Sequence, residues 1–131
     1  MTAASSDSRI GFVSLASLAD IPEGRAQVFA VRDLPGYSPA LEFLDELRIA
    51  VARAGEVVYA IEDRCSHDSG PLGQGEVHAD PGRPPEITCH RHGARFDLKT
   101  GKATRMPAIS PVAVYPVRVV EGEVEIDLSD A

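Results

Sequence analysis

An excess of positive charge is the first thing that the sequence lacks. Its 131 residues carry 20 acidic and 13 basic side chains, which gives a formal net charge of -7. Nucleic-acid phosphates would repel such a chain unless a local basic stripe compensated, and the sequence contains no such stripe. Nucleic-acid binding is therefore not expected.

Long apolar runs are also missing. No segment approaches the roughly 18 apolar residues that a membrane span needs. The stretch from Met1 to Arg9 is mostly small and polar and has no apolar signal region. We expect a soluble, cytoplasmic protein with no membrane partner, built as one domain over residues 1–131.

Cysteine is scarce, since the chain contains only Cys65 and Cys89. In a reducing cytoplasm, a pair of cysteines more often binds metal or reacts than forms a structural disulfide. Both cysteines have histidines close by in the sequence. This neighbourhood favours a metal site over two unrelated buried thiols.

Most of the chain alternates apolar and polar residues with a period of two, as half-buried strands do. The pattern predicts strands at residues 27–32, 47–53, 57–61, 117–119 and 123–128, with tight turns at Ala54-Gly55 and Glu121-Gly122. Such short strands predict an all-β antiparallel sandwich or barrel.

Two segments depart from this pattern. Residues 34–46 are compatible with either a helix or a strand, and both remain open. Residues 78–85 contain Asp80-Pro81-Gly82 and Pro84-Pro85, which interrupt strand pairing, so this segment is predicted to be a loop with His78 in solvent.

Two similar Cys-then-His arrangements carry the chemistry: Cys65-Ser66-His67 and Cys89-His90-Arg91-His92. A thiolate is a soft, charged donor, whereas a neutral imidazole is a borderline donor. Two of each can bind either zinc or a mixed-ligand iron cluster, and the residue types alone do not distinguish these.

Spacing favours the iron cluster. Structural zinc sites usually take ligand pairs that are separated by two or more residues, which is wider than Cys65-x-His67. In a two-iron cluster, each loop can instead give its cysteine to one iron and its histidine to the other.

These motifs resemble those of the Rieske ferredoxins that are associated with oxygenases. The resemblance rests on Cys65-x-His67, Gly70-Pro71-Leu72, Cys89-x-x-His92-Gly93 and Phe96-Asp97, and covers roughly residues 47–128. It implies a Rieske-like all-β fold whose cluster-binding portion spans about residues 63–109, with two ligand loops. It also implies one [2Fe-2S] cluster per chain.

The family pattern implies a role for each ligand. Cys65 and Cys89 would bind the inner iron, and His67 and His92 the outer, exposed iron. A third loop, Met106-Pro107-Ala108, would shield the cluster. His90 is a rival ligand, but only His92 keeps the family register.

By the same resemblance, the chain would be an electron carrier that takes electrons from a flavin-containing reductase and passes them to a terminal oxygenase. No catalytic residue is expected. The alternative from another class is a zinc-stabilised interaction module. We do not expect the chain itself to be an oxygenase. Once His67 and His92 are assigned to the cluster, only His78 and His90 remain as histidine ligands for a second iron site.

Mixed ligation also bears on the reduction potential. Two thiolates leave the oxidised cluster neutral, whereas four would leave it doubly negative, so Rieske centres reach about -150 to +300 mV. Respiratory Rieske proteins have a serine and a tyrosine that donate hydrogen bonds to the cluster. The matching residues here are Ala94 and Phe96, which lack donors, so we predict a potential toward the low end.

Overall fold

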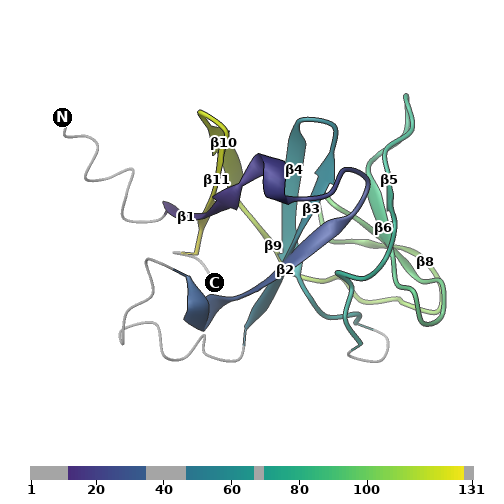
Figure 1. Cartoon of the computed structure of the whole chain (residues 1–131). Coiled ribbons are helices and arrows are strands. Elements are labelled where there is room, and N and C mark those ends of the chain that lie inside the picture. The colour runs from purple at the N-terminus through teal and green to yellow at the C-terminus, as the bar shows by residue number, and fades with distance from the viewer. Residues whose placement is uncertain (1–11, 35–46, 67–69, 129–131) are drawn as a thin grey trace.

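The computed structural model describes residues 12–34, 47–66 and 70–128, which form three antiparallel sheets (Figure 1). The strands are β1 (Phe12–Ser17), β2 (Ala26–Ala30), β3 (Arg48–Ala54), β4 (Val57–Glu62), β5 (Val77–His78), β6 (Glu86–Thr88), β7 (Arg95–Asp97), β8 (Ala103–Arg105), β9 (Val114–Tyr115), β10 (Val117–Val120) and β11 (Glu123–Asp127). Two short 3-10 helices, η1 (Leu18–Asp20) and η2 (Val31–Asp33), follow β1 and β2. None of the helices in these ranges is long and apolar enough to cross a membrane.

The strand order is β1-β11-β10 in the first sheet, β2-β3-β4-β9 in the second and β5-β6-β7-β8 in the third. In Figure 1 the second sheet lies between the other two. This central position requires β3 to bury both of its faces. Ile49 and Val51 pack into a core shared with the first sheet, whereas Ala50 and Ala52 pack into a second core shared with the third sheet.

Both predicted tight hairpins are present, one of them with its turn shifted by one residue. Between β10 and β11, Glu121 has a φ of 51° and Gly122 a φ of 82°, as a two-residue hairpin turn requires. Between β3 and β4, Ala54 pairs with Val57, so the turn consists of Gly55 and Glu56. That turn lies one residue later than predicted, because Gly55 is the residue that takes positive φ.

The predicted strands are confirmed with small shifts at their ends, and the expected all-β class is confirmed. The strand expected at 27–32 ends at Ala30, where η2 begins. Of the undecided segment 34–46, all but Leu34 lies outside the described residues.

The expectation for His78 was wrong. His78 ends β5 and is half-buried, and the irregular loop follows it. Because His78 pairs with Glu86, its ring lies beside Thr88, the diagonal neighbour on the same face. His78 Nε2 is 2.7 Å from Thr88 Oγ1. The pairing of these two-residue and three-residue strands left no periodic signal in the sequence.

Candidate metal centre

The first loop (65–70) and the second loop (89–94) are closed by the same hydrogen bond. The Cys65 N–H donates to the Gly70 carbonyl oxygen at 2.7 Å, and the Cys89 N–H donates to the Ala94 carbonyl oxygen, also at 2.7 Å. Each bond joins a cysteine to the fifth residue after it. Both cysteines therefore occupy the same position in two similarly closed loops.

The second loop also contains a tight internal turn. The Gly93 N–H donates to the Cys89 carbonyl oxygen at 3.0 Å, and Gly93 has a φ of 79°. Glycine adopts this left-handed conformation without the steric penalty that a Cβ would bring. The glycine after His92 thus lets the chain return to β7 directly after the ligand segment.

Both predicted cysteine ligands are buried together. The exposed fraction is 1% for Cys65 and 0% for Cys89, and both belong to one hydrophobic cluster that includes Leu72, Phe96 and Ala108. Neither cysteine forms a disulfide. Apolar residues from three separate segments, Leu72 after the first loop, Phe96 in β7 and Ala108, therefore surround the two thiols.

The predicted histidines differ from the cysteines in their surroundings. His92 is exposed on the second loop, and so is its rival His90. His67 lies outside the described residues. The structure thus brings Cys65 and Cys89 into one apolar environment and leaves His92 at the surface of the same loop system.

A third loop (106–111) joins the first. The Ser66 hydroxyl donates to the Ser110 carbonyl oxygen at 2.5 Å. The Met106-Pro107 peptide bond is cis, and the next residue, Ala108, is buried in the cluster that contains both cysteines. Of the three residues Met106-Pro107-Ala108, only Ala108 is buried, whereas Met106 is exposed, so a shielding role for this loop stays a prediction.

The exit from the first loop is tied to the entry of the second. The Thr88 N–H donates to the Glu76 carbonyl oxygen at 3.0 Å. A Cβ on the preceding Gly75 would collide with the Thr88 carbonyl oxygen, so only glycine lets the two segments approach this closely. Because Thr88 precedes Cys89, this contact helps to set the position of the second loop relative to the first.

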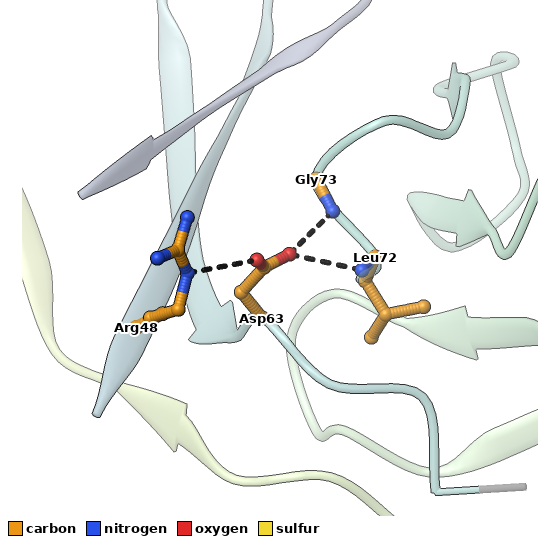
Figure 2. Close-up of polar contacts among 4 residues, drawn as sticks. All are labelled: Arg48, Asp63, Leu72 and Gly73. Atoms are coloured by element: carbon orange, nitrogen blue, oxygen red, sulfur yellow. Dashed lines mark hydrogen bonds and ion pairs between the residues drawn. The ribbon is translucent and has the colours of Figure 1, made fainter. Parts of the chain in front are cut away.

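Asp63 is a functional candidate that the sequence reasoning missed. Its carboxylate Oδ1 accepts hydrogen bonds from the Leu72 N–H at 2.9 Å and the Gly73 N–H at 2.6 Å (Figure 2). Its Oδ2 lies 3.8 Å from Arg48 Nε. An acidic residue directly after the apolar strand β4 and two residues before Cys65 was the available signal.

The donor set fits an iron-sulfur cluster. Two thiolates in an apolar interior are unfavourable unless bound metal neutralises their charge. Sulfur ligands inside and an exposed imidazole outside suit a cluster with one buried and one exposed iron. Within the described ranges, no three or more histidine, cysteine or acidic side chains are grouped to hold one metal ion, and His67 lies outside that set.

Comparison with known proteins agrees with this chemistry. A family model described as a Rieske-like [2Fe-2S] domain matches residues 25–127. Over 114 residues, the chain is 38% identical to the 3-phenylpropionate/cinnamic acid dioxygenase ferredoxin subunit of Escherichia coli strain K12, covering 87% of this chain and 91% of that protein.

Solved structures give the same result. The ferredoxin of carbazole 1,9a-dioxygenase from Nocardioides aromaticivorans IC177 has a TM-score of 0.70 and 32% identity, over 89% of this chain and 97% of that chain. A chain from a complex of reduced oxygenase and oxidised ferredoxin in carbazole 1,9a-dioxygenase has a TM-score of 0.66 and 28% identity, over 87% of this chain and 99% of that chain. The expected Rieske-like fold is confirmed.

Proposed function

The chain belongs to the family of Rieske-like [2Fe-2S] domains, and we propose that it is the ferredoxin component of an oxygenase system, with Cys65, Cys89, His67 and His92 as the cluster ligands. When bound, the [2Fe-2S] cluster supplies a centre that takes up and releases a single electron. The observation that carries the proposal is the pair of similarly closed loops, each with a buried cysteine at its start.

The proposed ligands fall into an inner pair of cysteines and an outer pair of histidines. Cys65 and Cys89 would hold the inner iron, where Leu72, Phe96 and Ala108 exclude water from the sulfur ligands. His92, and His67 by the family pattern, would hold the outer iron at the surface. An exposed imidazole edge gives a redox partner a short path to the site, so electrons enter and leave there without a chemical reaction of the protein's own side chains.

One of the two proposed redox partners is supported by a relative. A ferredoxin with 28% identity is known in a complex with its oxygenase, which supports a terminal oxygenase as the electron acceptor of this chain. A flavin-containing reductase would be the donor. We place the protein in the cytoplasm, because cysteines that serve as metal ligands suit a reducing compartment.

Anaerobic titration of the purified, air-oxidised protein with dithionite tests the proposal. We expect a coloured protein that contains iron and sulfide and bleaches with one electron per chain. Reduced protein that is then mixed with oxygen and cinnamic acid should regain its colour without forming a hydroxylated product. A colourless protein that contains zinc and does not respond to dithionite would instead establish the zinc-stabilised interaction module.

A further inference from the structure

The carboxylate of Asp63 lies at the base of the first loop and is not one of the proposed ligands. We propose that Asp63 is a positioning residue for the [2Fe-2S] site, an inference that rests on the proposed function. Its carboxylate, together with the amides of Leu72 and Gly73, forms a contact that we call the Asp63 clamp. The clamp holds the two ends of the first loop together and so sets how Cys65 presents its sulfur.

The clamp anchors the first loop to the central sheet. The Asp63 N–H donates to the Arg48 carbonyl oxygen at 2.9 Å, which fixes Asp63 to β3. The Asp63 side chain then binds the two amides that follow the first loop on its far side. The clamp thus connects the entry and the exit of this loop in addition to the bond from Cys65 to Gly70.

The amides, and not Arg48, are the main partners of this carboxylate. The Asp63 side chain is 3% exposed, whereas that of Arg48 is 63% exposed, and the two charges are 3.8 Å apart. Ion pairs with such an exposed side chain contribute little. The clamp therefore needs an acceptor oxygen at the right place more than it needs a negative charge.

Gly73 provides a separate observation for the same arrangement. A Cβ on Gly73 would lie 3.1 Å from Asp63 Oδ1 and would collide with the Val28 side chain. The missing side chain is what lets the backbone come so close to the carboxylate. Glycine at position 73 is thus the residue type that this close contact requires.

Losing the clamp should affect the cluster directly. Leu72 is fully buried in the hydrophobic cluster that contains both cysteines, and its amide is one of the two that Asp63 binds. If that amide is released, Leu72 no longer has a fixed position beside Cys65. We therefore expect weaker retention of the cluster and altered ligand geometry, while the strands remain folded.

Asp97 provides a matched control. Its Oδ1 accepts hydrogen bonds from the Lys99 N–H at 2.7 Å and the Thr100 N–H at 3.1 Å, the same two-amide pattern as in the Asp63 clamp. Asp97 ends β7, whereas the second loop precedes β7, so its turn lies at the other end of that strand from the ligands. Removing its carboxylate should weaken a turn without disturbing the cluster.

The test compares holoproteins with Asp63→Ala, Asp63→Asn, Asp63→Glu, Arg48→Ala and Asp97→Ala. Two readouts are used: the rate at which visible absorption is lost in the presence of an iron chelator, and the g-values of the dithionite-reduced protein in electron paramagnetic resonance. Substitutions of residues that support metal ligands typically cost about 10-fold to 100-fold in metal affinity. We expect an acceleration of about that size, with shifted g-values, for Asp63→Ala.

The other variants distinguish the position of the acceptor oxygen at residue 63 from the charge of its side chain. Asp63→Asn keeps an acceptor oxygen, so it should resemble the wild type in both readouts, as should Arg48→Ala and Asp97→Ala. Asp63→Glu keeps the charge but lengthens the side chain, so it should shift the g-values and lose its cluster faster. If Asp63→Ala yields no holoprotein, the order of Asn and Glu decides the question.

Three results would overturn the inference while leaving the proposed function intact: wild-type behaviour of Asp63→Ala, a defective Asp63→Asn beside an unaffected Asp63→Glu, or a defect in Asp97→Ala equal to that in Asp63→Ala. An equal defect in Asp97→Ala would mean that the Asp63 clamp contributes only to general stability and has no specific effect on the cluster. A wild-type protein without an iron cluster would instead contradict the proposed function itself.

Discussion

The Ser66 hydroxyl donates a hydrogen bond of 2.5 Å to the Ser110 carbonyl oxygen, which connects the first loop to the third. Ser66 directly follows the proposed ligand Cys65. Ser110 is separated from it by 44 positions in the sequence. The contact therefore links a ligand segment to the loop that is expected to shield the cluster.

Ser66→Ala should weaken this link. A typical hydrogen bond contributes about 1 kcal/mol to stability, so the free energy of unfolding of the variant should be lower by about that amount. The variant should therefore lose its cluster absorbance at a lower guanidinium concentration than the wild type. Ser110→Ala is the matched control, because the acceptor is a backbone oxygen that this substitution keeps. Equal midpoints for Ser66→Ala and wild type would contradict the role of this bond.

His92 and His90 make a second matched pair, since both are exposed on the second loop. His92→Ala should abolish the [2Fe-2S] cluster because it removes a proposed ligand, whereas His90→Ala should retain it. Iron content and visible absorption of the purified variants measure the difference. The reverse outcome would reassign the fourth ligand to His90.

Ala94 and Phe96 allow the reduction potential to be tested. Both are 0% exposed and share the hydrophobic cluster of the two cysteines, and neither side chain has a hydrogen-bond donor. Hydrogen bonds to the sulfur atoms of a cluster raise its potential, so Ala94→Ser and Phe96→Tyr should each raise it within the range of about -150 to +300 mV for Rieske centres. Protein-film voltammetry measures this change, and a potential that stays the same or falls in both variants would refute it.

Tyr115 predicts how stability depends on alkaline pH. Burial raises the pKa of Tyr115 above its ordinary value of 10.0, and the negative charge of Glu62 raises it further. Above about pH 10, the unfolded tyrosine loses its proton while the folded one keeps it, so the folded state loses stability as pH rises toward the folded pKa. Below about pH 10, Tyr115 keeps its proton in both states, and its contribution to the stability of the folded state is fully present.

Denaturant unfolding across this alkaline range checks the prediction. Tyr115→Phe should show a shallower loss of stability with pH than the wild type, because it has no proton to release. Glu62→Gln should show an intermediate slope, since it removes the second cause and leaves burial. Identical slopes in all three proteins would be inconsistent with a raised Tyr115 pKa.

Much of the central sheet, and the β10–β11 hairpin of the first sheet, was predictable because these strands carry clear patterns. The β3–β4 and β10–β11 hairpins were evident from alternation and from glycine-containing turns. The third sheet was not, since its strands are only two or three residues long and are too short to show a period. The pairing of β1 with β11 joins opposite ends of the chain, and nothing local in the sequence indicates it.

The proposed cysteine ligands were predictable because few residue types can bind a metal. Residues that act through their position in the fold, such as Asp63, were not. Cys65 and Cys89 could be selected from their histidine neighbours, and both prove to be buried in one cluster. The role of Asp63 depends on the backbone amides of Leu72 and Gly73, and a backbone N–H by itself does not distinguish one residue type from another except proline. That position 73 needs glycine follows only from its closeness to Val28 and Asp63 in the fold. Such a contact becomes visible only when the chain is folded.

Electron paramagnetic resonance of the dithionite-reduced protein tests the central claim most directly. A cluster that is bound by two cysteines and two histidines should give a signal with a lower average g-value than a four-cysteine [2Fe-2S] cluster gives. We expect that signal in the wild type and its loss in His92→Ala. A reduced wild-type protein that is silent and contains zinc in place of iron would contradict it.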